Sequence, residues 1–297
     1  MPETVAELIS ILDLEPVGES QFVGADAGST RQRVFGGKVL AQALMAGYRT
    51  VAPHRIAHSL GAYFLRGGIP GQPITYTVER TRDGGSFSAR RIQASQGERV
   101  IFSMVASFHD LEPGLNHADV APLHVPAPEH CPPLSEILGA NSRRTVEAWG
   151  QEWGVLDTRF ASDPAVFYSP GDTSQPHRQR DAALKIWVRT ESPLPSDYRI
   201  HQAVLAYLSD LTLLAVSAVP HPVEFAGPGM MAASIDHSMW FHRPARADQW
   251  LLYDQVSPSA SAGLGFSFGR LFSDGQLVAS CAQEGLIRLT DQSALVR

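Results

Sequence analysis

Chemistry-bearing side chains cluster in the stretch IDHSMWFHRP at 235–244, which holds an acid, two imidazoles and a hydroxyl. Such a set could bind a metal ion or form a Ser-His-Asp nucleophile. A metal site is not favoured, because the chain has no HExxH motif and because His237 and His242 on one strand would point to opposite faces. A serine nucleophile is not favoured either, since no GxSxG elbow is present. The glycines of GLGFSFG at 263–269 miss the GxGxxG spacing of a dinucleotide site.

Asp210 is a second candidate for chemistry, because it lies in the strongly apolar run YLSDLTLL. Burying a carboxylate there costs free energy unless the group is hydrogen-bonded or paired. One interpretation is a functional acid held in a site of low dielectric constant. The other is a surface acid at a frayed helix end. The residues alone leave both open.

A repeat runs through the chain. The residues that recur at an offset of 177 are Phe64 and Phe241, Arg66 and Arg243, Gln72 and Gln249, Tyr76 and Tyr253, and Ser103 and Ser280. Those that recur at an offset of 179 are His58-Ser59 and His237-Ser238, Phe87 and Phe266, and Arg91 and Arg270. Shifts of two residues keep strand parity, so we infer one duplicated β-unit. Because a histidine occurs in both copies, as His58 and His237, a structural role is favoured over a chemical one for His237.

Gln283 breaks the repeat in an informative way. Alternation on its strand places it on the same face as Ala279 and Cys281, where a buried amide needs partners. Its counterpart at the offset of 177 is Ala106, so only the second copy carries the amide. This asymmetry predicts one active site, in the second half. A glutamine that only bonds neighbouring backbone is the alternative.

The elements that must position these residues are strands and two long helical runs. Alternating runs that predict strands are PITYTVERT, SARRIQAS, VIFSMVASF, WLLYDQV and LVASCAQEGLIRL. The helical runs span 36–51 and 198–218, and the second is apolar on nearly every face, as expected of a helix wrapped by other structure. A buried helix against an antiparallel sheet, occurring twice, is an α+β arrangement.

Three units are expected from this organisation. They are an N-terminal unit at 1–110, a Pro-rich connector at 111–183 with an amphipathic helix in LSEILGANSRRTVEAWGQEWG, and a C-terminal unit at 184–297 that carries the candidate site.

Several motifs, in this order, resemble the acyl-CoA thioesterase II family of bacterial and peroxisomal type. They are RQRVFGGKVLAQAL, RDGGSFSARR, SDL in the second helical run, SIDHSMWFHRP and VASCAQEG, and the resemblance covers about residues 20–110 and 183–289. It implies a double hot-dog fold and hydrolysis of fatty acyl-CoA to free fatty acid and CoA, without metal or cofactor. It also implies a water-orienting trio that maps onto Asp210, Ser234 and Gln283. Ser234 stands where relatives often carry Thr, and the hydroxyl is kept.

Gly36 and Gly37 open the first helical run and are substrate-binding candidates. Amides at a helix N-terminus attract negative charge, although a tight turn would also need glycine. The resemblance implies that a glycine amide here polarises the thioester carbonyl, with Gly37 facing Asp210 between the two units. His58 is a further substrate-binding candidate, because it could lie near the shared pocket.

Two alternatives remain from other classes. One is an acyl-CoA-binding protein without turnover, although a pure binder needs no buried acid. The other is a hot-dog hydratase, against which weighs the separation of Asp210 from His201 by nine residues, on another turn of the helix.

Composition limits the partners. The 297 residues are 44% hydrophobic and 18% charged with a net charge of −6, so the chain is globular and shows no basic footprint for nucleic acid. No signal-peptide pattern and no apolar run approaching about 20 residues is recognised, so no membrane insertion is expected. Two cysteines without a CxxC pair suggest a cytoplasmic location. Sheet edges and apolar faces predict a homodimer or homotetramer.

Overall fold

The computed structural model describes residues 2–25, 32–139, 153–162 and 181–290, apart from residues 222, 226 and 228. Its helices are α1 (Val5–Leu12), α2 (Gly36–Tyr48), α3 (Leu134–Gly139) and α5 (Tyr198–Ser209), with 3-10 turns η1 (Pro128–His130) and η3 (Leu214–Ala218). Its first strands are β1 (Glu15–Gly18), β2 (Gln21–Gly24), β3 (Ile56–Phe64), β4 (Ile74–Asp83), β5 (Phe87–Gln96) and β6 (Arg99–His109). The remaining strands are β7 (Leu156–Phe160), β8 (Ala183–Thr190), β9 (Met230–Ser234), β10 (Asp236–Phe241), β11 (Leu251–Ser261), β12 (Leu264–Ser273) and β13 (Gln276–Leu289).

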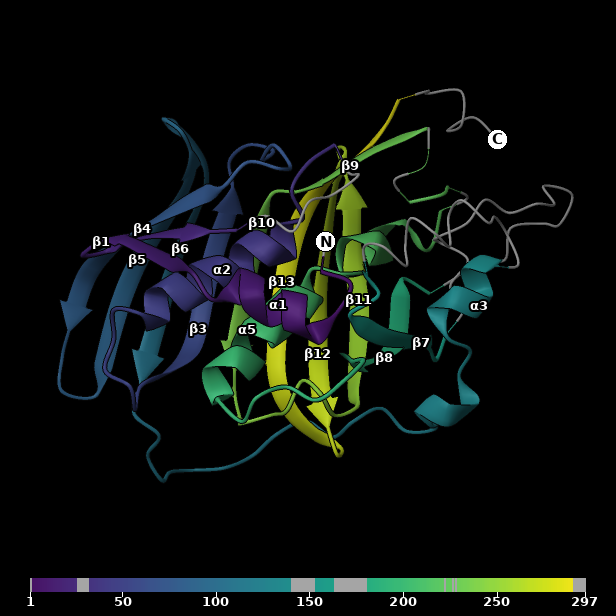
Figure 1. Cartoon of the computed structure of the whole chain (residues 1–297). Coiled ribbons are helices and arrows are strands. Elements are labelled where there is room, and N and C mark those ends of the chain that lie inside the picture. Colours follow the sequence, from purple (N-terminus) through teal and green to yellow (C-terminus); the bar gives the residue numbers. More distant parts are fainter. Residues whose placement is uncertain are drawn as a thin grey trace, which may run out of the picture.

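All of these strands belong to one antiparallel sheet. Its order is β1-β2-β4-β5-β6-β3-β10-β13-β12-β11-β8-β7, and β9 pairs with β13 beside this path. Strands β3 and β10 pair at the centre and join the two halves, which repeat the same order outward from this seam. Figure 1 shows the helices α1, α2 and α5 lying against the sheet. The predicted α+β class and all five predicted strands are confirmed.

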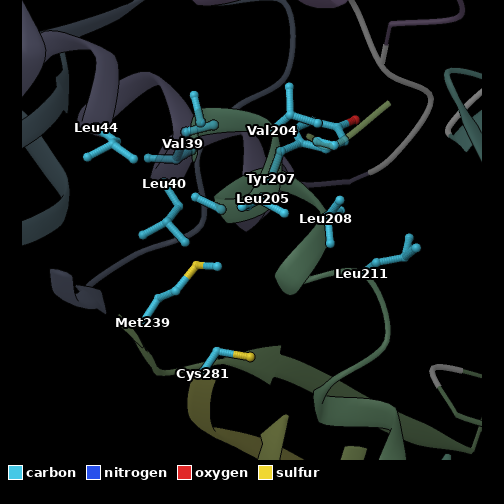
Figure 2. Close-up of a cluster of buried hydrophobic side chains, with 14 of the residues drawn as sticks. Val39, Leu40, Leu44, Val204, Leu205, Tyr207, Leu208, Leu211, Met239 and Cys281 are labelled. Atoms are coloured by element: carbon cyan, nitrogen blue, oxygen red, sulfur yellow. The ribbon is translucent and has the colours of Figure 1, made fainter. Parts of the chain in front are cut away.

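The two long helices pack against each other in antiparallel fashion, so that the first residues of α2 meet the last residues of α5. Leu40 and Leu44 of α2, and Val204 and Leu205 of α5, are completely buried, and Figure 2 shows them as parts of one cluster of buried side chains. Burying each such side chain contributes about 1.5 to 3 kcal/mol. The wrapped helix expected from the sequence is therefore confirmed.

The second helix is shorter than predicted. A continuous helix over 198–218 is wrong: α5 ends at Ser209, and Asp210 is the C-cap, with φ −88° and ψ 2°. Aspartate has low helix propensity, and the following apolar residues enter the core as the 3-10 turn η3. The segment 198–218 has the length and mean hydropathy (1.3) of a membrane span, yet 89% of its most apolar window is buried inside the protein, as in a core helix.

The sheet register tests the repeat directly. Tyr76 pairs with Ala94 and Tyr253 pairs with Leu271, so both partners keep the offset of 177. The pairs Ala62–Met104 and Met239–Cys281 also keep it, which places His237 at the ladder position of Leu60. The equivalence of His58 with His237 is therefore wrong, as are the other matches at 179. A β-bulge between Ala57 and Ser59 displaces His58 locally.

The ends of the chain and the connector hold elements that the sequence did not reveal. These are α1, β1, β2 and the edge strand β7, which pairs with β8. Of the helix expected at 134–154, the structure describes α3 (Leu134–Gly139), and residues 140–152 lie outside the described part of the chain.

Candidate active site

Three of the predicted site residues meet at the C-terminal end of α5. The carboxylate oxygen Oδ1 of Asp210 accepts a hydrogen bond from Ser234 Oγ at 3.1 Å and another from Gln283 Nε2 at 2.5 Å. Both donors bind Oδ1. The second oxygen, Oδ2, lies toward Gly36 at the start of α2.

Strand pairing explains why Ser234 and Gln283 come together. Ser234 ends β9 opposite Gly285 of β13, and Gln283 lies two residues earlier on the same face. A Cβ at Gly285 would lie 2.5 Å from the Leu214 side chain, so only glycine lets β13 pass this close to η3. Gln283 is completely buried, and its Oε1 has no hydrogen-bond partner among the described residues. That oxygen can accept a hydrogen bond from a water or a ligand.

The N-terminus of α2 supplies the opposite wall. A Cβ added to Gly36 would lie 2.7 Å from Asp210 Oδ2 and 2.9 Å from the Phe64 ring, so the carboxylate rests on the first residue of this helix. The N-cap residue, Phe35, makes no side-chain capping hydrogen bond. Amides in the first turn of a helix have no intrahelical acceptor and favour negative charge.

Gly37 has a different environment from the one expected. Its Cβ would lie 2.3 Å from the backbone oxygen of Tyr207, so this glycine allows α2 to pack closely on α5. Gly36 is the glycine whose Cβ position meets the Asp210 carboxylate, and the expected role of the Gly37 amide stays a prediction.

A buried polar network lies behind Asp210. Tyr253 Oη donates to the backbone oxygen of Ser209 at 2.7 Å and lies 3.1 Å from Cys281 Sγ. Ser209 Oγ lies 2.9 Å from His237 Nε2. The roles of Tyr253 and Ser209 were not predicted from the sequence; the only signal was the recurrence of Tyr253 as Tyr76.

Burial sets the protonation of this network. It raises the pKa of the Cys281 thiol to about 12 and raises that of the Tyr253 hydroxyl as well. It lowers the pKa of His237 to about 4. Near neutral pH the network therefore holds a thiol, a phenol and a neutral imidazole, and provides no thiolate for nucleophilic attack.

The opposite ends of the paired helices are built differently. There, at the C-terminus of α2 and the N-terminus of α5, a cavity of about 230 Å³ lies beside Arg49 and Arg199. Arg49 forms an ion pair with Asp13, which directly follows α1, and Arg199 pairs with the N-cap residue Asp197 at 2.6 Å. Helix α1 lies beside this end, and the described residues here include no counterpart of the Asp210, Ser234 and Gln283 cluster.

His58 is not brought to the trio. It lies near the start of β3, about 20 Å along the strand from Phe64 at the rise of a β-strand. Its Nε2 lies 2.8 Å from Ser107 Oγ, and its ring packs edge-on against Phe87 and His109. Within the described ranges, no group of three or more His, Cys, Asp and Glu residues could hold a metal ion.

Comparison with known proteins decides the family. The family model for acyl-CoA thioesterase matches residues 155–286, and the model for the acyl-CoA thioesterase N-terminal domain matches residues 25–109. Acyl-CoA thioesterase 2 of Haemophilus influenzae is 35% identical over 98% of this chain and 100% of its own length. The chain belongs to the acyl-CoA thioesterase family.

Solved structures agree with this assignment. The crystal structure of an acyl-CoA thioesterase II from Mycobacterium marinum is 40% identical, with a TM-score of 0.77, and covers 96% of this chain and 99% of its own. A hot-dog protein from Alicyclobacillus acidocaldarius, at 21% identity and a TM-score of 0.73 over 96% and 99% of the two chains, shows the fold alone. This acyl-CoA thioesterase is a double hot-dog protein and hydrolyses acyl-CoA thioesters; the binding-only and hydratase alternatives are not favoured.

Proposed function

We propose that Asp210, Ser234 and Gln283 orient the water that attacks the thioester carbon of a fatty acyl-CoA. Ser234 and Gln283 hold Oδ1 of Asp210, and the carboxylate then accepts a proton from the water as general base. The buried Oε1 of Gln283 is a second acceptor for the same water. Water placed between two acceptors presents a lone pair to the substrate.

The N-terminus of α2 has the complementary role in this proposal. The thioester oxygen gains negative charge during attack, and the amides of Gly36 and Gly37 begin a helix without a side-chain cap. Such donors stabilise an oxyanion by about 3 kcal/mol each. Collapse of the intermediate expels the CoA thiolate and leaves a free fatty acid. A thiolate leaves readily, so the mechanism needs no separate general acid, and it uses no metal or cofactor.

The observation that carries the proposal is the position of the Asp210 carboxylate, which lies between two polar side chains of the second half and the first turn of a helix from the first half. We further propose that the chain divides into units at 1–110 and 184–297 with a connector at 111–183, and that only the second unit supplies the water-orienting trio.

We also propose that the protein is cytoplasmic and forms a homodimer or homotetramer. Aromatic and aliphatic side chains of the central strands are exposed, including Tyr63, Val105 and Trp240. Exposed apolar surface of this kind favours association between copies.

Asp210→Asn tests the mechanism. The amide keeps the shape of the carboxylate but accepts no proton, so turnover is expected to fall at least about a hundredfold, with acyl-CoA binding changed only a few-fold. Thiol release would be followed over a series of acyl chain lengths. The matched control is Asp197→Asn at the other end of α5, where asparagine remains a good N-cap and turnover should stay near the parental value. A folded Asp210→Asn enzyme with parental turnover would overturn the role of the carboxylate.

A further inference from the structure

Two arginines of the first half lie on segments that adjoin the N-terminus of α2. Arg66 follows the end of β3, where the Phe64 ring touches Gly36. Its Nη1 donates to the backbone oxygen of Val100 at 2.8 Å, which anchors one edge of the guanidinium, and the side chain is otherwise exposed.

Arg33 lies in the segment that leads into α2, beside the segment that carries Arg66. The amide of Val34 donates to the backbone oxygen of Gly68 at 3.0 Å, so the two segments run side by side. A Cβ at Gly67 would lie 2.8 Å from Cδ of Arg33 and 3.2 Å from its Nε. The Arg33 side chain therefore lies across Gly67, the residue that follows Arg66 in the chain. Between the residues that the structure describes, no ion pair joins either arginine to a carboxylate.

The duplicated half provides an internal comparison. Arg243 is the counterpart of Arg66, and its Nη1 donates to the backbone oxygen of Leu277, the counterpart of Val100, at 2.9 Å. The Nη2 of Arg243, however, donates to Asn116 Oδ1 at 2.6 Å and to the backbone oxygen of His117 at 2.9 Å.

In the second half, Asn116 and His117 of the connector thus bind the Nη2 group of Arg243. In the first half, Arg66 makes its hydrogen bond to Val100 but has no corresponding Nη2 bond to a described residue. The arginine with the open edge is the one at the N-terminus of α2, where the carboxylate of Asp210 lies, whereas Arg243 lies at the N-terminus of α5, where its backbone oxygen accepts from Tyr198 Oη.

We propose that Arg33 and Arg66 bind the phosphate groups of the CoA moiety. Arginine presents a planar set of donors that matches phosphate oxygens. The pantetheine arm of CoA separates the phosphates from the thioester, so the phosphates are expected at a distance from the Asp210 carboxylate. A local positive pair is needed because the protein carries a net charge of −6 and its substrate is a polyanion. This inference rests on thioester hydrolysis at the Asp210 site.

Substrates that differ only in their phosphates test the proposal. Arg66→Gln and Arg33→Gln should each raise KM for an acyl-CoA about five- to tenfold with little change in kcat, as expected for one partly exposed charge-assisted hydrogen bond. With the matching acyl-pantetheine, which has no phosphate, the same variants should equal the parent. Arg243→Gln is the matched control and should leave KM for both substrates unchanged.

An acyl-dephospho-CoA identifies the phosphate. An effect of Arg66→Gln that persists with this substrate assigns the pyrophosphate, and an effect that disappears assigns the 3′-phosphate. Equal KM changes with acyl-CoA and acyl-pantetheine, or no change with either, would overturn the phosphate site. A parent enzyme that hydrolyses neither substrate would instead overturn the proposed mechanism, so the two failures are distinguishable.

Discussion

Tyr253→Phe tests how the fold holds the Asp210 carboxylate. The Tyr253 hydroxyl is completely buried and donates to the backbone oxygen of Ser209, the last residue of α5. A helix leaves its final carbonyl groups without intrahelical donors, so this hydroxyl supplies a partner that α5 cannot. Removing it leaves a buried carbonyl unsatisfied directly before Asp210.

The structure sets the size of the expected effects. An unsatisfied buried carbonyl costs about 1 to 3 kcal/mol of unfolding free energy. Displacing a catalytic group by about 1 Å can lower turnover about a hundredfold. Because Ser234 and Gln283 still bind the carboxylate, we expect a fall in kcat of about tenfold, or about 1.4 kcal/mol in the barrier. KM should not change, because Tyr253 lies behind the site.

The assay is steady-state thiol release combined with denaturant unfolding, and the control is Tyr76→Phe. Tyr76 occupies the same ladder position in the first half, is equally buried, and donates to Gln42 Oε1 at 2.7 Å, far from the carboxylate. The Tyr76→Phe variant should lose a similar amount of unfolding free energy and keep the parental kcat. If Tyr253→Phe also keeps the parental kcat while losing stability, the hydroxyl serves only the fold and the reasoning is refuted.

Three further outcomes are expected. Ser234→Thr should keep most of the turnover, and Ser234→Ala should lose about tenfold or more with its hydrogen bond to the carboxylate; equal rates in both variants would remove Ser234 from the site. Burial lowers the pKa of His237 to about 4, below the 6.5 of the unfolded chain, so its neutral form stabilises the fold above pH 6.5 and this stability is lost as the pH falls toward 4. Relative to His237→Gln, the parent should lose about 2 kcal/mol of unfolding free energy between pH 7 and pH 5, and parallel unfolding curves would contradict this. Iodoacetamide should leave turnover intact, because burial raises the pKa of both Cys131 and Cys281; stoichiometric labelling that removes activity and is prevented by substrate would indicate an acyl-enzyme instead.

The strands and the buried helix were predictable because alternation and apolar periodicity reflect burial directly. The end of α5 was not, because the apolar run continues beyond Asp210 into η3, and periodicity does not distinguish a helix from a buried 3-10 turn. The backbone of Asp210 shows where the chain leaves the helix, and hydrogen bonds from Ser234 and Gln283 on distant strands hold its side chain there.

The proximity of Asp210, Ser234 and Gln283 was predicted through motif resemblance, with support from the unusual Asp210 and from the asymmetry between Gln283 and Ala106. The contact of Tyr253 with Ser209 could not be found in this way, because it joins residues 44 positions apart through a backbone atom. The equivalence of His58 with His237 was wrong because matching letters takes no account of strand register, in which His237 occupies the ladder position of Leu60.

The seam between β3 and β10 has an evolutionary consequence. Two identical units around a twofold axis must carry the same residues at both ends of their paired helices, so every gain at one end is imposed on the other. Joining the units in one chain removes that constraint. Here one end brings Asp210 together with Ser234 and Gln283, while at the other end Arg49 pairs with Asp13 and α1 lies beside the cavity. Each end can therefore change separately, and substitutions around Arg49 need not alter the residues around Asp210.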